Sequence, residues 1–223
     1  MVNYEIIAFY KENKEEVLIH AEALKEKLNL DLRYEKMPSN RKSTRKLVTE
    51  NTVLSIFNRT TMNYRTLLKY VYEIPGPVLL VSPSDSLESY DKLKIPVGYL
   101  MENKEKVVWA NFLQKKNSSI AIELLIPTEK DDNIRSMVAS NVRFMENVLD
   151  NSNSVYTKSL IDKGFEDLLK TTFVNTKDGV VLVMRPFRVF SFFIPPNLRL
   201  YDSHGRSQVL LIPRDDELYV PCH

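Results

Sequence analysis

The sequence predicts an α/β protein in which parallel strands alternate with helices, and three observations lead to this prediction. A six-residue motif occurs twice, as Glu-Asn-Lys-Glu-Glu-Val at 12–17 and as Glu-Asn-Lys-Glu-Lys-Val at 102–107. A similar apolar segment closes each half, at 78–83 and at 209–213. Apolar segments of strand length also alternate with segments of helix length, which is typical of a parallel sheet covered on both faces. One α/β unit built twice is therefore expected.

The first half is expected to open with a strand at 4–9 and a helix at 12–28. Within that helix the apolar residues recur at the spacing of one helix face, at Val17, Leu18, Ala21, Leu24 and Leu28. Further strands are expected at 31–36, 52–57 and 77–81, with short helices at 41–49 and near 64–71. The polar stretch 84–93 has the composition of a linker.

The second half is longer and is expected to be complete. Strands are predicted at 95–99, 120–126, 155–160, 180–184 and 209–212, with helices at 102–116 and around Phe165. Asp131 and Asp132 stand where a helix start favours negative charge. After them, apolar residues recur every three or four positions, at Ile134, Val138, Val142, Met145 and Leu149. The first half lacks one strand and one helix by comparison, so we interpret it as a shortened copy.

Composition limits the classes of function. The 223 residues suit two small domains, and the net charge is only +2, from 31 basic and 29 acidic side chains. This balance gives no global field to attract nucleic acid or a membrane, so neither is expected as a partner. The single cysteine, Cys222, excludes an intrachain disulfide. Without a basic leader or an apolar run near 18 residues, we expect a soluble, cytoplasmic protein.

The second half resembles a universal stress protein domain. That family repeats strand and helix five times and ends on a proline-bounded apolar strand, as in Gln-Val-Leu-Leu-Ile-Pro at 208–213. The first half resembles a truncated copy, because 74–81 is similar to the family's Cys-Pro-Val-Leu-Val-Val ending. The resemblance runs from about 4 to 213. It implies two tandem Rossmann-like (adenine nucleotide alpha hydrolase-like) parallel-sheet domains, a truncated one at 1–83, a linker at 84–93 and a complete one at 94–223.

The family's nucleotide motif is damaged in this sequence. Nucleotide-binding members follow a strand ending in Met-Gly with Gly-x-x-Gly, nine residues and Gly-Ser, so that bare backbone amides approach the phosphates of ATP. Here Met184 matches the strand end, but the following positions carry Arg185, Arg188, Leu198 and Arg199. The family's aspartate near the adenosine is replaced by Tyr99, and by Tyr10 in the first copy. We therefore expect no cofactor and no ATP binding in the manner of the family.

The replacing arginines have two interpretations. Arg185, Arg188, Arg199 and Arg206 would gather at the carboxyl edge of the sheet, where open α/β proteins bind ligands, and guanidinium groups could hold an anion there. Alternatively, they are solvated loop arginines. The candidate ligand-binding residues are therefore Tyr99, Met184, Arg185, Arg188 and Arg199.

Two sets of apolar residues are candidates for interfaces. The resemblance implies that the closing strands pair with each other in an intramolecular pseudo-dimer, through Val78, Leu80, Val209 and Leu211, because subunits of the family commonly dimerise through their final strands. Phe190 and Phe193 belong to a group of four phenylalanines at 187–193 that suggests contact with the other domain or another subunit, although ordinary core packing explains it equally well. We expect a homo-oligomer of tandem chains, with any protein partner unknown.

The remaining motifs indicate no catalysis. Arg41-Lys42 and Arg45-Lys46 form a basic cluster without interleaved aromatic residues, so we interpret it as a solvated helix face and not as a nucleic-acid site. His20, His204 and His223 lack ligand spacing, and no metal site is expected. The sequence has no nucleophile elbow, P-loop or Gly-x-Gly-x-x-Gly.

These observations predict a non-enzymatic, stress-associated regulatory or scaffold module with a degenerate nucleotide site. The first alternative is a sensor that holds a nucleotide or another anion in an arginine-lined pocket. The second is an unrecognised α/β hydrolase or transferase, which would need a nucleophile and a base brought together from distant segments.

Overall fold

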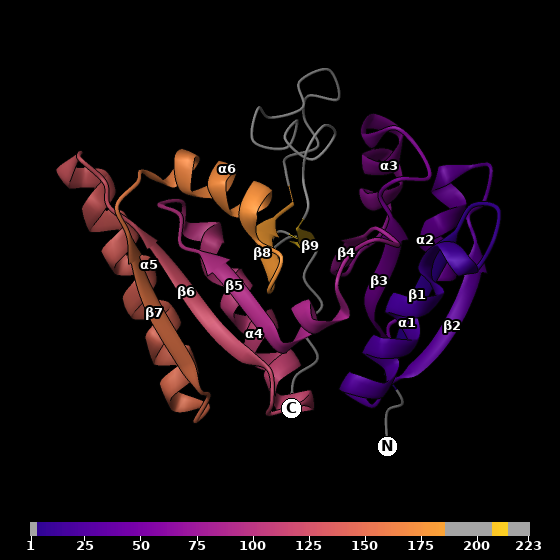
Figure 1. Cartoon of the computed structure of the whole chain (residues 1–223), viewed down its shortest axis with the longest axis horizontal. Helices are drawn as coiled ribbons and strands as arrows, with labels where there is room; N and C mark the ends of the chain where they lie inside the picture. The colour runs from indigo at the N-terminus through magenta and orange to yellow at the C-terminus, as the bar shows by residue number, and fades with distance from the viewer. Residues whose placement is uncertain (1–3, 186–206, 214–223) are drawn as a thin grey trace.

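The computed structural model describes residues 4–185 and 207–213 and contains one mixed sheet of nine strands. The strands lie in the order β2-β1-β3-β4-β9-β8-β5-β6-β7. Every neighbouring pair is parallel except β4 and β9, which are antiparallel. The sheet therefore has two parallel parts that meet at β4 and β9 (Figure 1).

The first half supplies four strands to the sheet. Its elements are β1 (Glu5–Tyr10), α1 (Glu15–Leu28), β2 (Asp31–Lys36), the short 3-10 turn η1 (Arg41–Ser43), α2 (Thr44–Leu47), β3 (Thr52–Asn58), α3 (Tyr64–Val71) and β4 (Val78–Val81). Strands β3 and β4 are buried along their whole length, as expected of strands covered on both faces.

The second half supplies five strands. Its elements are η2 (Leu87–Asp91), β5 (Lys92–Pro96), η3 (Met101–Lys104), α4 (Glu105–Lys116), β6 (Ala121–Pro127), α5 (Asp132–Asn151), β7 (Tyr156–Ile161), α6 (Phe165–Asn175), β8 (Val180–Met184) and β9 (Gln208–Ile212). The α/β class, with a mostly parallel sheet and alternating helices, is the predicted one.

Helix α5 forms where the sequence predicts a helix, and its first turn shows the physical reason. The Asp131 carboxylate accepts hydrogen bonds from the backbone N–H groups of Asn133 and Ile134, at 2.8 and 3.0 Å. These bonds satisfy amides that have no partner inside the helix, which fixes its start. Val138, Met145 and Leu149 are then buried on one face of the helix, as their spacing predicts.

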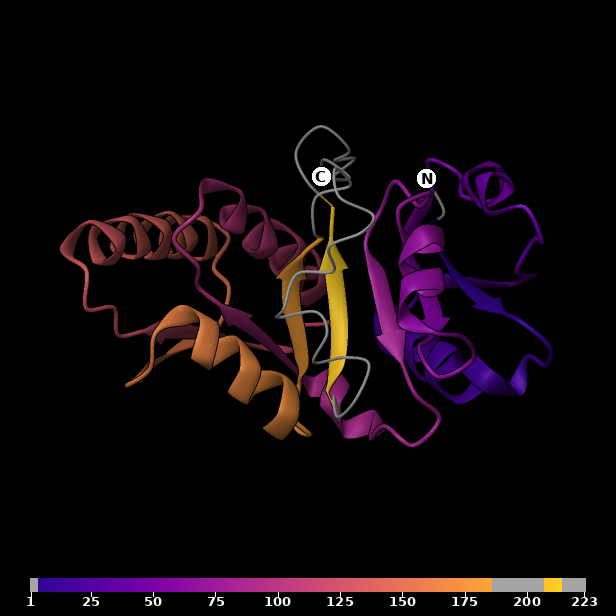
Figure 2. The same cartoon turned by 90° about the horizontal axis from the view of Figure 1, so that it is seen from above.

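Two apolar layers cover the two faces of the sheet, and each runs through both halves. Helices α1, α4 and α5 contribute to one layer, and α3 and α6 contribute to the other. Strand β9 lies between β8 and β4 (Figure 2) and sends alternate side chains into the two layers. Because neither layer stops at the antiparallel pair, the two halves share both apolar layers.

The closing strands lie side by side. Val78 is opposite Leu211, and Leu80 is opposite Val209. All four side chains are fully buried in the layer that α3 and α6 cover. Strand β9 is thereby paired on both sides, so its backbone groups are not exposed at a sheet edge.

The observed β5 differs from the predicted strand at 95–99. It begins at Lys92 and ends at Pro96. Leu93 and Ile95 are buried, and Lys94 forms an ion pair with Asp178 at 2.8 Å. The start of this strand lies within the polar stretch 84–93, whose composition predicts a linker. The stretch 84–93 also contains η2, in which Tyr90 is 4% exposed. It is a packed connection and not a loose one.

Candidate functional site

Arg185 lies directly after β8, where the structure shows a bridge between the two halves. Its backbone N–H donates to the carbonyl of Ile212 at 2.7 Å. Its guanidinium donates to the carbonyls of Ile74 and Gly76, at 2.6 and 2.5 Å. The residue is 2% exposed. The side chain therefore reaches across β9 to the segment before β4 and binds backbone oxygens there.

The other predicted ligand-binding residues have different surroundings. Tyr99 is half-buried, and its ring packs edge-on against Phe165 with centroids 6.1 Å apart. Met184 is half-buried against the layer formed with α1, α4 and α5. Arg188, Arg199, Phe190 and Phe193 lie outside the described residues. Of the expected arginine cluster, the structure describes Arg185 alone, and its guanidinium binds two carbonyls of the chain itself.

The first half has a short connection at the place where the family motif would stand. Strand β3 ends at Asn58 and α3 begins at Tyr64, so only 59–63 join them. The Asn58 carboxamide oxygen accepts from the backbone N–H of Thr60 at 2.8 Å, which tightens the turn. Asn63 caps α3 by accepting from the backbone N–H of Thr66 at 2.9 Å. A connection of this length has no room for the Gly-x-x-Gly and Gly-Ser segments.

The backbone amides of the loop after β1 already bind an anion, the carboxylate of Glu16 on α1. This carboxylate accepts from the backbone N–H groups of Lys11, Glu12 and Asn13 at 3.2, 3.1 and 3.1 Å. Consecutive amides that point at one spot form a typical anion-binding concavity. In the first half, a side chain of the protein itself occupies that concavity.

The equivalent position in the second copy of the motif is Lys106. It is 1% exposed, and its ammonium donates to the carbonyl of Pro96 at the end of β5. Burial lowers the pKa of Lys106 to about 7, because a low-dielectric interior disfavours the charged amine. Sequence reasoning missed this residue, although the aligned motifs differ at only this one position.

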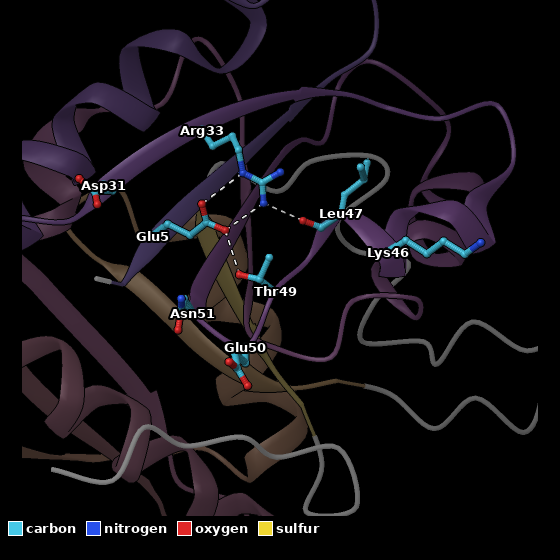
Figure 3. A pocket seen from close by; sticks show the side chains of 8 residues that line it. All are labelled: Glu5, Asp31, Arg33, Lys46, Leu47, Thr49, Glu50 and Asn51. Carbon is cyan, nitrogen blue, oxygen red and sulfur yellow. Dashed lines mark hydrogen bonds and ion pairs between the residues drawn. The ribbon is translucent and has the colours of Figure 1, made fainter. Parts of the chain in front are cut away.

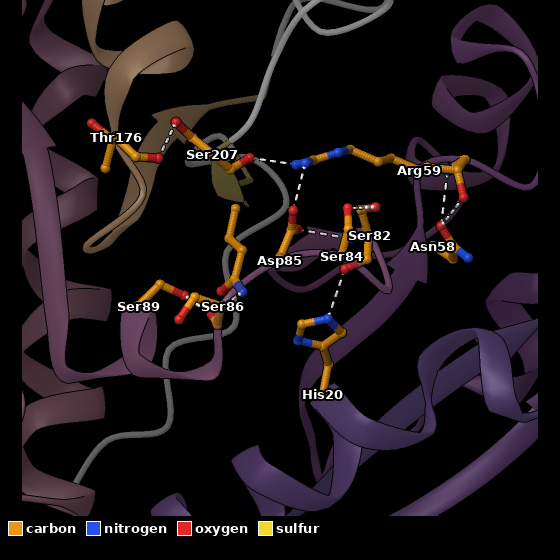
Figure 4. A network of polar contacts seen from close by, with 12 residues as sticks. His20, Asn58, Arg59, Ser82, Ser84, Asp85, Ser86, Ser89, Thr176 and Ser207 are labelled. Carbon is orange, nitrogen blue, oxygen red and sulfur yellow. Dashed lines mark hydrogen bonds and ion pairs between the residues drawn. The ribbon is translucent and has the colours of Figure 1, made fainter.

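A buried polar network lies where β4 ends and β9 begins (Figure 4). His20 on α1 is fully buried, and its two ring nitrogens lie 2.8 Å from the carbonyl of Ser82 and 2.8 Å from the hydroxyl of Tyr90. Burial lowers the pKa of His20. The neutral ring can donate to one neighbour and accept from the other, so both nitrogens are used within the fold.

An ion pair forms the second part of this network. Arg59 binds Asp85 at 2.8 Å, with both side chains less than 10% exposed, and it also donates to the carbonyl of Ser207. Asp85 accepts from the backbone N–H of Ser82 at 2.7 Å. Burial raises the pKa of Asp85, while Arg59 opposes that shift. The Ser207 hydroxyl contacts the end of α6, so the network connects both halves.

Two surface pockets lie at the amino ends of strands, one in each half. One, of about 420 Å³, is lined by residues at the amino ends of β1, β2 and β3: Glu5, Asp31, Arg33, Lys46, Leu47, Thr49, Glu50 and Asn51 (Figure 3). Within it, the Arg33 guanidinium binds the Glu5 carboxylate at 2.9 Å and lowers the pKa of Glu5. The other, of about 640 Å³, lies at the amino ends of β5 and β6. Open α/β sheets bind ligands at the carboxyl ends of their strands, so neither pocket is at the expected place.

The described ranges also limit other kinds of site. Between residues 4 and 185 and in 207–213, no three His, Cys, Asp or Glu side chains are grouped as a metal site requires. In the same ranges, none of the helices has the length and apolar character needed to cross a membrane.

Comparison with known proteins identifies the fold. A universal stress protein from Archaeoglobus fulgidus matches with a TM-score of 0.59 and 12% identity, over 96% of this chain and 87% of that one. A putative universal stress protein from Pseudomonas aeruginosa UCBPP-PA14 matches with a TM-score of 0.53 and 12% identity, over 96% and 84%. A functionally unknown protein from Pseudomonas aeruginosa PAO1 matches with a TM-score of 0.51 and 11% identity, over 96% and 83%.

The similarity is one of structure and not of sequence. No family model matches the chain, and no curated protein matches it significantly. The mostly parallel α/β sheet and the structural neighbours together show that this chain has the fold of universal stress proteins.

Proposed function

We propose that this chain is a non-enzymatic, stress-associated module with a regulatory or scaffold role, and that its nucleotide site is degenerate. The stress association is carried over from the universal stress proteins that share its fold. The observation that carries the degenerate site is the position of Arg185, whose buried guanidinium binds the carbonyls of Ile74 and Gly76. A side chain committed to those carbonyls contributes to the junction of the halves and is not available to bind phosphate.

The first half supports the same proposal by different means. Its β3–α3 connection spans only 59–63, and Glu16 occupies the amides after β1. A phosphate group placed near those amides would meet a carboxylate and be repelled by it. Each half thus uses its own residues where a nucleotide-binding relative would leave backbone exposed.

The buried histidine supports the non-enzymatic part. A general base must have a free nitrogen within hydrogen-bond reach of a reacting group. Both nitrogens of His20 are instead directed at the Ser82 carbonyl and the Tyr90 hydroxyl. Its environment is that of a structural residue.

Analysis of the purified protein for bound small molecules tests this proposal. The protein would be denatured and the supernatant analysed by ion-pair chromatography and mass spectrometry for nucleotides, and by ion chromatography for inorganic anions. We expect no species near one equivalent per chain. A stoichiometric nucleotide or anion would contradict the degenerate site and would favour the sensor.

A further inference from the structure

The excess of positive over negative charge in this chain lies in one segment of the first half. Between residues 36 and 72 there are eight lysine and arginine residues and a single acidic residue, Glu50. The rest of the chain has 23 basic and 28 acidic residues and is therefore net negative. The small net charge of the whole protein conceals this separation.

The fold gathers most of these cations on neighbouring elements. The hydroxyl of Tyr70 on α3 donates to the carbonyl of Pro38 at 2.9 Å, which holds the segment before η1 against α3. Six exposed basic residues lie on η1, α2 and α3, and we call them the basic surface: Arg41, Lys42, Arg45, Lys46, Arg65 and Lys69. Figure 1 shows α2 beside α3, and Arg65 and Lys69 are one turn apart on α3.

The charge of the basic surface is largely uncompensated. Arg41 lies 3.9 Å from Glu73, a weak contact. Within residues 4–185 and 207–213, no ion pair involves any of the other five. Arg59 is not part of this surface, because it points into the buried pair with Asp85. Like charges on neighbouring elements repel one another, and a negatively charged partner would relieve that repulsion.

The surroundings of the basic surface indicate the kind of partner. None of the large apolar side chains that the structure shows as exposed lies between residues 36 and 72. A membrane would be expected to receive apolar anchors, and single-stranded nucleic acid would be expected to stack on aromatic rings. Recognition at this surface must therefore rest on charge.

The border of the basic surface favours a short partner. Lys46 extends away from Arg33 in Figure 3, but it lines the same pocket as Glu5, Asp31 and Glu50. A long phosphate polymer that continued past Lys46 would run over these carboxylates and be repelled. A short acidic segment of a protein can end before it reaches them.

We propose that the basic surface is the docking site for an acidic protein segment. The inference rests on the proposed function, because it names the chemistry of the partner that such a module would hold. Charge complementarity of this kind governs the rate and selectivity of association more than its final affinity. Binding should therefore weaken steeply as salt is raised from low ionic strength to about 0.15 M.

Fluorescence anisotropy with a labelled peptide of alternating glutamate and alanine tests the proposal. The test variant combines Arg45→Glu, Lys46→Glu and Lys69→Glu. The matched control combines Lys25→Glu, Lys115→Glu and Lys170→Glu, which changes the total charge equally at exposed positions on α1, α4 and α6. Circular dichroism would verify that both variants are folded.

We expect the wild type to bind the peptide, the test variant to bind at least about tenfold more weakly, and the control to stay within about twofold. The proposal would be overturned if the wild type shows no binding, or if both variants lose affinity equally. A short DNA duplex that binds more tightly than the peptide at the same salt would replace the protein partner with nucleic acid. A copurifying nucleotide would contradict the proposed function without changing any of these results, so the two failures can be told apart.

Discussion

Glu16 and Lys106 occupy the same position of the repeated motif, and both bind backbone groups, Glu16 as an acceptor and Lys106 as a donor. Each is the second residue of its helix, α1 or α4. Glu16 accepts hydrogen bonds from three amides of the loop before it, whereas Lys106 donates to the carbonyl of Pro96. The two copies of one motif thus close the ends of β1 and β5 with opposite chemistry.

The titration of Lys106 should make folding depend on pH. Its pKa is about 7 in the folded state and 10.5 for an unperturbed lysine, so between these limits the unfolded chain binds a proton that the folded chain does not. Stability then rises with pH through this window. Replacement by methionine (Lys106→Met) should stabilise the protein most below pH 7, by at least about 1 kcal/mol, and progressively less toward pH 9.5.

Urea denaturation of both proteins from pH 6 to 9.5, followed by circular dichroism, measures this difference. Subtracting the free energy of unfolding of the variant from that of the wild type cancels the contributions of the other titrating groups. A difference that stays constant across the range would show that the Lys106 pKa is not lowered.

Arg185 should stabilise both halves together. Replacing it with methionine (Arg185→Met) leaves the carbonyls of Ile74 and Gly76 without their donor, which should cost roughly 3 kcal/mol. Amide hydrogen exchange should accelerate in β3 and β4 as well as in β8 and β9. The control Arg135→Ala, at a side chain that is 60% exposed, should cost less than about 0.5 kcal/mol. Faster exchange confined to β8 would contradict the bridge.

Much of the fold could be predicted from the sequence, because it depends on periodic apolar residues. Helix α5 follows from the spacing of Ile134 to Leu149 and from the capping Asp131. The pairing of β4 with β9 was expected from the resemblance to universal stress proteins. The start of β5 is not predicted, because Lys92 and Lys94 are charged, half-buried residues of a strand that is paired on both sides.

The candidate site was much harder to predict. The Arg185 side chain binds backbone carbonyls more than 100 positions away in the sequence, and a backbone carbonyl has no sequence signature. His20 meets Ser82 and Tyr90 at separations of 62 and 70 residues, and a single buried polar side chain produces no periodic pattern. Such contacts depend on the tertiary structure, and sequence spacing does not reveal them.

The buried His20 should make the protein lose stability in mild acid. Its folded-state pKa is lowered below 6.5, mainly by burial, so below that pH the unfolded chain takes up a proton that the folded chain resists. The stabilisation by neutral His20 is fully present above pH 6.5 and declines as the pH falls. In His20→Gln the amide can still donate to Ser82, and this pH dependence should be absent.

Thermal unfolding of both proteins between pH 7.5 and 5 provides the measurement for His20. Asp85 and Arg59, the charged groups that influence His20, are present in both, so the comparison isolates the imidazole. If the melting temperature of the variant falls with pH as steeply as that of the wild type, the acid sensitivity comes from another group. Asp85 has a raised pKa, so its titration would increase the stability of the fold as the pH falls, opposite to the effect of His20.

Assembly can be tested by light scattering. We expect at least a homodimer at micromolar concentration, with an interface of at least about 1,000 Å² that involves either the segment of Phe190 and Phe193 or the sheet face that the shortened first half leaves uncovered. The edge strand β2 is a poor candidate for that contact, because Arg33 and Glu35 pair with each other at 2.6 Å on it and make its surface polar. A monomeric mass would refute the dimer, and a dimer that persists in Phe190→Ser/Phe193→Ser would exclude the phenylalanines.

Calorimetric titration of the purified chain with ATP and magnesium tests the degenerate nucleotide site most directly. Arg185 binds carbonyls of the first half, and Glu16 occupies the amides after β1, so neither of these groups is open to a phosphate. We predict no saturable heat and a dissociation constant weaker than about 1 mM, or roughly −4 kcal/mol. A micromolar dissociation constant would contradict the account and identify the chain as a nucleotide sensor.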